Sequence, residues 1–367
     1  MGMRVALIYN EPQKPPHDEV SEYQAVAAVL EAVDAVHQAL LELDFDVTLV
    51  PLLPPIEQAE KELRKLDTEL VFNLFEGFYD QPETEAVIPE ILSEMDIAFT
   101  GCLAPVLRLA LDKAKTKLIL KAGGIKTADF QVLNPDTLHM FRLDYPCIVK
   151  PRCDDGSNGL SEHSLVHDFS ALERQVSLIS RSHAGDALVS QFLPGREFNA
   201  TVMGNSELAV LPVSEIVYSL PPGMPEILTF DAKWEDDSLY FDGTKPVCPA
   251  DIQAEEEQHI AETITRAYRL LGCRGYARID MRLDREGELN VIEVNPNPDI
   301  SPGTGAARQA EAARMTYTQF IEKIVQLALD GKEDENRYPV YVPRRQTSRS
   351  RNTGRHTRIQ TFRSSGS

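Results

Sequence analysis

The sequence contains no apolar run that approaches the roughly eighteen residues needed to cross a membrane. Its opening stretch, MGMRVALIYN, lacks the basic region, long apolar core and cleavage site of a signal peptide. Cysteine is scarce as well. The five cysteines form no CxxC pair, and their odd number argues against a disulfide framework or a zinc cluster. These absences predict a cytoplasmic protein without membrane contact, whose cysteines are small buried side chains.

Positive charge is also in short supply, since 37 Lys and Arg face 57 Asp and Glu, for a net charge of −20. Residues 337–367 hold eight arginines and no acid, so the preceding residues carry about −28. Such an acidic body disfavours nucleic-acid binding over a broad face. The polar tail, residues 336–367, is predicted to be disordered, and a solvated extension is favoured over an RNA-binding or partner-binding arm.

The first part of the chain alternates buried-strand and helical patterns. A length of 367 residues allows two or three domains. The order strand, helix, strand, helix, strand predicts a parallel sheet with helices on both faces, whose ligands meet the loops at the strands' carboxyl ends. The expected elements are strands at 4–10, 45–51 and 70–74 and helices at 21–43 and 56–66, with candidate loops at 10–11 and 73–79.

A second pattern predicts a β-hairpin, with strands Tyr276–Leu283 and Leu289–Val294 around a polar turn that ends in glycine. Because side chains alternate along a strand, Arg278 and Asp280 share one face, and Glu293 and Asn295 share a face of the partner strand. If the two faces coincide, carboxylate and amide oxygens converge as Mg²⁺ prefers, beside a guanidinium that can neutralise developing charge. A solvated surface hairpin is the alternative, and the apolar positions between these residues disfavour it.

A lysine and a glycine-rich loop follow another apolar strand. Lys150 ends the strand that begins at Tyr145, and the loop 154–159 contains Gly156 and Ser157. Glycine lets backbone amides approach phosphate oxygens, and a serine hydroxyl adds a donor. The P-loop pattern GxxxxGK[ST] is absent.

Together these motifs resemble the ATP-grasp superfamily, with R-x-D at Arg278 and Asp280, E-x-N at Glu293 and Asn295, and V-K-P followed by G-S-x-G near Lys150. Among its members the chain is most similar to D-alanine-D-alanine ligases. The resemblance implies an α/β ATP-grasp fold, in which an N-terminal Rossmann-like parallel-sheet domain precedes two α+β lobes that clamp ATP. The expected domains are 1–100, 101–186 (with the lid loop), 187–335 (with the metal site) and a tail at 336–367.

The same resemblance implies roles for particular residues. Metal ligands are Asp280, Glu293 and Asn295, with two Mg²⁺ expected and Mn²⁺ as an alternative. Arg278 and Ser157 act at the reacting centre. ATP is bound by Lys113, Lys150, Gly156, Ser157, Lys233, Glu197 at the ribose, and the backbone of Gln191 and Leu193 at the adenine. Taken alone, Lys113 reads as a solvent-facing helix lysine and Glu197 as an edge-strand acid.

The expected substrate contacts depart from the family pattern. Glu76 stands where the family commonly has histidine, Trp234 where it has tyrosine, and Asp299 where it has a glycine near the second substrate's carboxylate. A carboxylate beside another carboxylate is repulsive. Glu76 and Asp299 therefore suggest a second substrate with an amine or amide at that point. Alternatively, Glu76 is an exposed loop acid and Trp234 a core residue.

The resemblance implies an ATP-dependent ligase that forms an amide bond through an acyl phosphate, and a homodimer by family precedent. Its partners would be small amino acids or a peptide. The joining of D-alanine in cell-wall biogenesis and the joining of other amino acids are left open. An inactive nucleotide-binding regulatory protein is less favoured, because the expected phosphate and metal residues are present.

Overall fold

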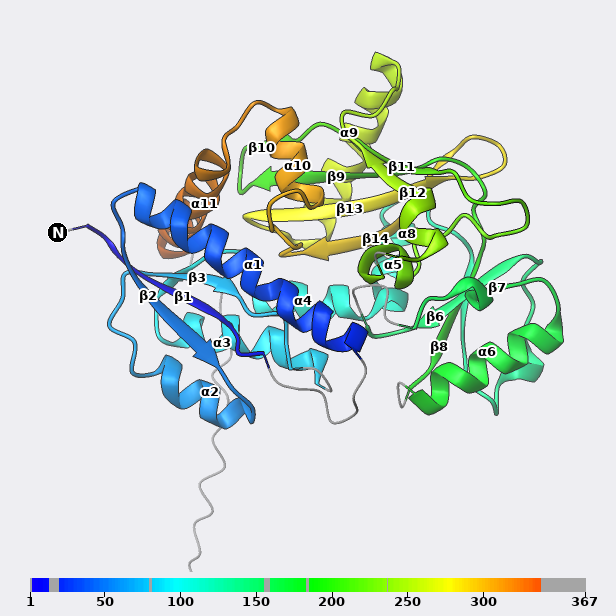
Figure 1. The fold of residues 1–367 in the computed structure, drawn as a ribbon, viewed down its shortest axis with the longest axis horizontal. Helices are drawn as coiled ribbons and strands as arrows, with labels where there is room; N and C mark the ends of the chain where they lie inside the picture. The colour runs from blue at the N-terminus through cyan, green and yellow to red at the C-terminus, as the bar shows by residue number, and fades with distance from the viewer. Residues whose placement is uncertain are drawn as a thin grey trace, which may run out of the picture.

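The structure is a computed structural model that describes residues 2–12, 20–78, 81–154, 159–182, 185–235 and 237–337. Side chains of 20–28, 234 and 333–337 are not described. Three sheets organise these residues, each with its own helices (Figure 1).

The N-terminal sheet is parallel, with strand order β2-β1-β3-β4, which confirms the predicted β-α-β-α-β unit. Alternate residues of its strands pack on opposite faces. Leu7 and Phe72 pack with α1, whereas Ile8 and Val71 pack with α2 and α3. The elements are β1 (Arg4–Asn10), α1 (Val20–Glu42), β2 (Asp46–Leu52), α2 (Ile56–Leu63), β3 (Leu70–Leu74), α3 (Val87–Glu94) and β4 (Ala98–Phe99).

The central sheet is antiparallel, with order β5-β8-β6-β7, and α6 covers one of its faces. Val149 and Val189 point toward α6 and form a core with it. Because side chains alternate, Lys150 and Ser190 point to the other face. The elements are β5 (Phe130–Leu133), β6 (Cys147–Pro151), β7 (Leu165–Val166), α6 (Phe169–Ser182) and β8 (Ala187–Gln191).

The third sheet has the order β12-β11-β9-β13-β14. Strand β11 pairs with the first residues of β9, and β10 pairs with its last residues. Residues of α4, α5 and α9 pack on one face, and α10 and α11 pack on the other. The elements are β9 (Glu197–Gly204), β10 (Leu208–Val210), β11 (Ser214–Tyr218), β12 (Thr244–Val247), β13 (Tyr276–Leu283), β14 (Leu289–Pro296), α4 (Ala104–Leu111), α5 (Lys113–Ala122), α9 (Ala254–Leu271), α10 (Gly305–Ala312) and α11 (Tyr317–Arg337). Short helices complete the chain at α7 (Asp231–Trp234), α8 (Leu239–Gly243), and 3₁₀ turns Pro82–Ala86, Leu138–Met140 and Glu162–Ser164.

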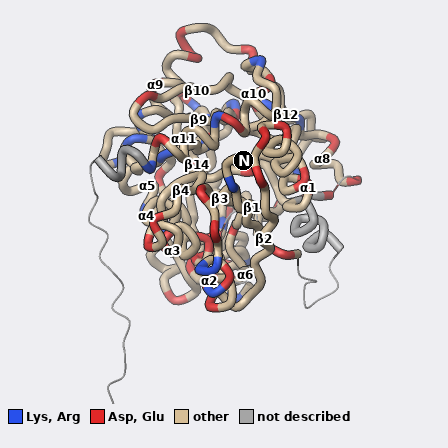
Figure 2. Tube along the Cα trace, turned by 90° about the vertical axis from the view of Figure 1, so that its left-hand side faces the viewer, with Lys and Arg blue, Asp and Glu red and all other residues tan. Residues whose placement is uncertain are grey.

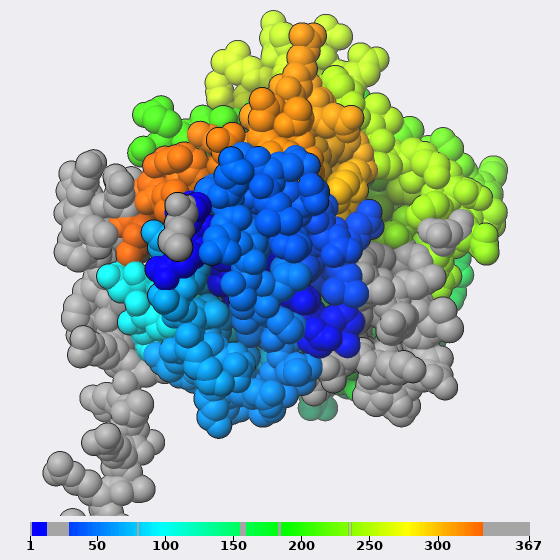
Figure 3. Space-filling view, turned by 60° about the vertical axis from the view of Figure 1, so that its left-hand side comes forward, coloured from blue at the N-terminus to red at the C-terminus, as the bar shows by residue number. Residues whose placement is uncertain are grey.

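The first and last helices lie side by side, as Figure 3 shows for the blue and orange segments. Val36 and Leu40 of α1 belong to the same buried cluster as Phe320 and Ile324 of α11. This cluster also contains Tyr276 of β13. The N-terminal sheet and the third sheet therefore share one core, whereas the central sheet has a core of its own.

Two features differ from the sequence-based expectations. The apolar pattern at 312–329 predicts one closing helix, but α11 begins only at Tyr317, because Arg314, with a left-handed φ of 63°, separates it from α10. Cys102, Cys147 and Cys273 are buried as predicted, but Cys153 is exposed and Cys248 half-buried. Helix α11 runs to Arg337, just past the predicted start of the tail, and residues 338–367 lie outside the described range. The domain boundaries stay predictions.

Acidic residues, drawn red in Figure 2, are spread over most of the elements. Within the described ranges, no helix combines the length and apolarity that a bilayer crossing requires.

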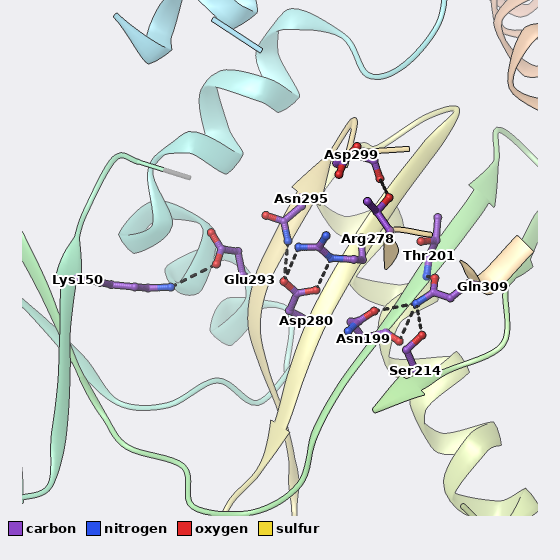
Figure 4. Close-up of polar contacts among 11 residues, drawn as sticks. Lys150, Asn199, Thr201, Ser214, Arg278, Asp280, Glu293, Asn295, Asp299 and Gln309 are labelled. Carbon is purple, nitrogen blue, oxygen red and sulfur yellow. Dashed lines mark hydrogen bonds and ion pairs between the residues drawn. The ribbon is translucent and has the colours of Figure 1, made fainter. Parts of the chain in front are cut away.

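Gln309 joins α10 to the third sheet. Its side chain is fully buried and accepts a hydrogen bond from the Thr201 N–H at 2.9 Å. Its amide donates to the Asn199 backbone and side-chain oxygens and to Ser214 Oγ. Figure 4 shows this network beside the polar hairpin. One side chain thus satisfies groups on two strands.

Substituting Gln309→Ala should lower the free energy of unfolding by about 2 to 3 kcal/mol, because buried donors and acceptors lose their partner. Urea titration of the purified protein measures the change. Gln326→Ala, on the exposed face of α11, removes only a contact with Asp330 and should cost less than about 0.5 kcal/mol. Equal losses in the two variants would contradict this account of Gln309.

Candidate active site

The hairpin β13–β14 brings the predicted polar residues onto one face. Asp280 lies opposite Glu293, and Arg278 lies opposite Asn295, as predicted (Figure 4). The register shifts after Asp280, which leaves Ile292 as the extra residue of a β-bulge. Because of this bulge, Val291 and Val294 can both face the apolar core while the carboxylate between them faces the site.

Glu293 lies between two lysines from other elements. Lys113 Nζ, at the start of α5, is 2.6 Å from Glu293 Oε1, and Lys150 Nζ, on β6, is 3.4 Å from Oε2. Lys113 also donates to the Asp154 carbonyl at the edge of the glycine-rich loop. Burial alone would raise the pKa of Glu293, but Lys113 and Lys150 hold it well below its usual range. The carboxylate is therefore ionised.

Asp280 is paired with Arg278 through two bonds, of 2.7 Å from Nε and 3.0 Å from Nη2. Asn295 Nδ2 donates to the same carboxylate at 3.0 Å. Burial works against the charge of Arg278, but Asp280 outweighs it and raises the pKa of the guanidinium. These bonds hold the Arg278 and Asp280 side chains against each other.

Lys233, on α7, is a further half-buried lysine close to these groups. Burial lowers the pKa of Lys233, and the neighbouring Arg278 lowers it further, whereas Asp280 and Glu293 oppose the shift. Four cationic side chains thus lie around the two inner carboxylates: Lys113, Lys150, Lys233 and Arg278 around Asp280 and Glu293. Glu197 and Asp299 act more weakly on Lys233 and Arg278, and Glu197 has its own cation in Arg282. A buried excess of positive charge is costly unless an anion compensates it.

The donor set fits a magnesium nucleotide. Within the part of the chain that the structure describes, no three His, Cys, Asp or Glu side chains cluster as a metal site. Two carboxylates and an amide suit Mg²⁺, which usually takes one or two protein carboxylates and completes its shell with water and phosphate. The surplus lysines match the charge of those phosphates.

Glu197 has partners that the sequence did not reveal. Its Oε2 accepts bonds from Arg282 Nη1 at 3.0 Å and from the Tyr218 hydroxyl at 2.8 Å. Burial raises the pKa of Glu197, and Arg282 counteracts this shift. Oε1 takes no part in these two bonds. The residue is therefore one member of a buried network.

The end of β8 and the residues after it leave one backbone N–H, that of Leu193, available to a ligand. The Gln191 N–H donates to the Asp129 carbonyl, and the Phe192 N–H donates to the Pro146 carbonyl. The Leu193 N–H makes no hydrogen bond to another described residue. This donor follows directly on the strand that carries Ser190.

Asp299 and Glu76 lie on two separate loops and both act on Tyr276 of β13. Asp299 is exposed, and its Oδ1 accepts from the Ser301 N–H at 2.8 Å and from Ser301 Oγ at 2.7 Å. Burial raises the pKa of Tyr276, and both Glu76 and Asp299 raise it further, so the two acids lie near the same buried tyrosine. Asp299 also favours the charged form of Arg278.

A close approach of backbone to side chain positions the Asp299 loop. Asn297, with a left-handed φ of 53°, accepts the Cys102 N–H at 2.7 Å. A Cβ on Gly101 would lie 2.2 Å from the same Asn297 oxygen, so only glycine fits there.

Some predicted residues fall outside the description, and some important ones were not predicted. Gly156, Ser157 and the Trp234 side chain lie outside the described part. The sequence did not indicate the role of Arg152. Its Nε and Nη2 donate to the Asp112 carboxylate at 3.0 and 2.7 Å, and Asp112 caps the N-terminus of α5. Burial of Asp112 is outweighed by Arg152, which lowers the Asp112 pKa to about 2. This pair holds Lys113 beside the loop that follows Arg152.

Comparisons with known proteins agree with this geometry. A family model described as "D-ala D-ala ligase C-terminus" matches residues 119–326. The uncharacterized protein y4sG of Sinorhizobium fredii (strain NBRC 101917 / NGR234) is 31% identical over 326 residues, covering 87% of this chain and 90% of that protein. A D-alanine-D-alanine ligase of Mannheimia succiniciproducens is 29% identical over 302 residues, covering 80% and 91%.

The fold is shared with solved ligases. D-alanine-D-alanine ligase from Bacillus anthracis, complexed with ATP, superposes with a TM-score of 0.69 at 20% identity, over 91% of this chain and 99% of that one. VanG D-Ala:D-Ser ligase from Enterococcus faecalis gives 0.70 at 20% identity, over 89% and 100%. The protein is an ATP-dependent ligase with an ATP-grasp fold, and its family uses ATP and Mg²⁺. On the family match and the shared sequence, the chain belongs to the D-alanine-D-alanine ligase family.

Proposed function

We propose that this ligase joins a carboxylate to an amine by way of an acyl phosphate. The observation that carries the proposal is the surplus of cations around Asp280 and Glu293, of which Lys113 and Lys150 are buried. A triphosphate with Mg²⁺ would supply the missing negative charge and a leaving group. The substrate carboxylate would attack the terminal phosphorus with release of ADP, and the amine would then attack the acyl carbon with release of phosphate.

The residues divide into three tasks. Lys113, Lys150 and Lys233 bind phosphate oxygens, and Arg278 neutralises charge at the reacting centre. When bound, Mg²⁺ offsets charge on the transferring phosphoryl group, and two ions are proposed here. The proposed metal ligands are Asp280, Glu293 and Asn295, and the remaining nucleotide contacts are Gly156, Ser157, Glu197, Gln191 and Leu193.

Two substrate classes compete for the acceptor site. The curated relatives named D-alanine-D-alanine ligases support D-alanine. The carboxylates of Glu76 and Asp299, both close to Tyr276, support an acceptor that presents an amine or amide at that point. Trp234 is proposed to contribute to this substrate region. Cell-wall synthesis follows only from the first class.

ADP release tests the proposal directly. The purified protein, with Mg²⁺ and ATP, is offered D- and L-amino acids singly and in pairs, and products are identified by mass. ADP release that depends on both substrates and yields an amide is expected. Tight ATP binding with no turnover on any pair would overturn the proposal and favour a regulatory nucleotide-binding role.

Replacing Glu293→Gln should reduce kcat about 100- to 1,000-fold, because the amide keeps the shape but loses the charge that would hold Mg²⁺. Steady-state ADP release measures this effect. Glu288→Gln, in the turn of the same hairpin, breaks only an exposed ion pair with Lys126 and should leave kcat nearly unchanged. Similar losses in both variants would point to hairpin damage and contradict the metal role.

Changing Asp299→Asn should alter which acceptors react. The asparagine oxygen can still accept from Ser301, so the loop is retained while the charge is removed. Acceptors that carry a second cation should lose about 10-fold in kcat/KM relative to neutral ones, since an opposing charge is worth about 1 to 2 kcal/mol in a partly exposed site.

The competition between paired acceptors, read by mass, gives this ratio directly. Asp330→Asn serves as the control, because Asp330 is an exposed acid of α11 that is not among the proposed site residues. An acceptor ratio that does not change in Asp299→Asn would show that this carboxylate plays no part in selection.

A further inference from the structure

Lys117 is a buried lysine that none of the proposed roles uses. It lies one helical turn after Lys113, so both side chains project from the same side of α5. Only 3% of Lys117 is exposed, and its Nζ donates to Thr127 Oγ1 at 2.6 Å. The ring centroid of Phe130 is 5.8 Å from the same nitrogen.

Phe130 belongs to the face of the central sheet that α6 leaves free. It pairs across the strands with Ser190, and cross-strand partners point to the same side. Ile148 is the partner of Ser190 on the other side, one residue before Val149. The Ser190 hydroxyl is buried, and it finds no partner among the described residues. Apart from Lys150, this part of the face is apolar with one spare hydroxyl, which suits a flat aromatic base.

The ammonium of Lys117 stands between that face and the phosphate lysines. The charged groups that act on it most strongly are Lys150 on β6, Glu293 on β14, Lys121 on α5 and Asp129 before β5. An ammonium has three donors, and within the described residues Thr127 takes one of them. The ammonium form therefore has donors that an anion from outside the chain can satisfy.

We propose that Lys117 is a further nucleotide-binding lysine, whose ammonium bonds the nucleotide between its base and its phosphates. The inference rests on the proposed function, since it names another residue of the same nucleotide site. Thr127 and Phe130 orient the side chain, and the nucleotide supplies the acceptors.

Protonation accompanies this contact. In the free protein, burial lowers the pKa of Lys117 to about 7, and the positive charge of Lys150 adds to the shift. An anionic nucleotide favours the ammonium and raises this pKa again. At pH 8 the free side chain is mostly neutral, so nucleotide binding takes up a proton, whereas at pH 6 it is already charged. Affinity should therefore fall as the pH rises above 7.

Calorimetry of Mg²⁺–ADP binding in buffers of different ionisation enthalpy tests the inference. At pH 8 the wild-type protein should take up about one proton per ADP, because the terminal phosphate, with a second pKa near 6, is already ionised. Lys117→Met should bind ADP at least about 10-fold more weakly and without this uptake. Lys117→Arg carries a permanent positive charge, so it should bind ADP without proton uptake. Its fold should be perturbed less than that of the methionine variant.

Lys126→Met, which removes an exposed lysine, is the control and should match the wild type. Failure of the wild type to bind ADP would overturn the proposed function itself. If the wild type binds ADP and Lys117→Met binds it with the same affinity and the same proton uptake, only the role of Lys117 is overturned.

Discussion

The carboxylate of Glu293 is the point on which the site depends. It is ionised although largely removed from solvent, because Lys113 and Lys150 approach it from α5 and from the central sheet. Removing one partner of such a group would leave an uncompensated charge, which is costly in a low-dielectric environment. These ion pairs hold β14, α5 and β6 in one arrangement. The lysines could bind phosphate instead, and the carboxylate could bind a divalent cation.

The apolar cores divide the fold into two parts, which are joined mainly through polar contacts. The N-terminal and third sheets share an apolar core, including Tyr276 and Phe320. The central sheet packs chiefly on α6, and ion pairs of Arg152 and Lys150 join it to the rest. Ionic contacts respond to a charged ligand far more than apolar packing does. A nucleotide at this junction would change the forces that hold the central sheet.

Much of the site could be predicted from sequence, because strand alternation is local. The facing of Asp280 and Glu293 follows from two short strands and one turn. The bulge at Ile292 could not be predicted from the hairpin sequence alone. It arises because Val291 and Val294 both pack in the core formed with other elements. Likewise, the interruption near Arg314 is invisible in an apolar pattern that continues across it.

The missed residues depend on contacts distant in sequence. Arg282 and Glu197 are 85 positions apart, and no local pattern links them. Lys117 carried no signal of its own in the sequence, and its burial arises where the central sheet, through Phe130, covers α5. The acceptor residues are harder still, since charge alone narrows the substrate's chemistry without naming it.

A crystal structure with Mg²⁺ and ADP tests the central claim most directly. The account predicts that the Nζ atoms of Lys113 and Lys150 leave Glu293 for phosphate oxygens, and that Mg²⁺ takes their place on the Glu293 carboxylate. A nucleotide bound elsewhere, or both lysines still on Glu293 with no metal beside it, would contradict it.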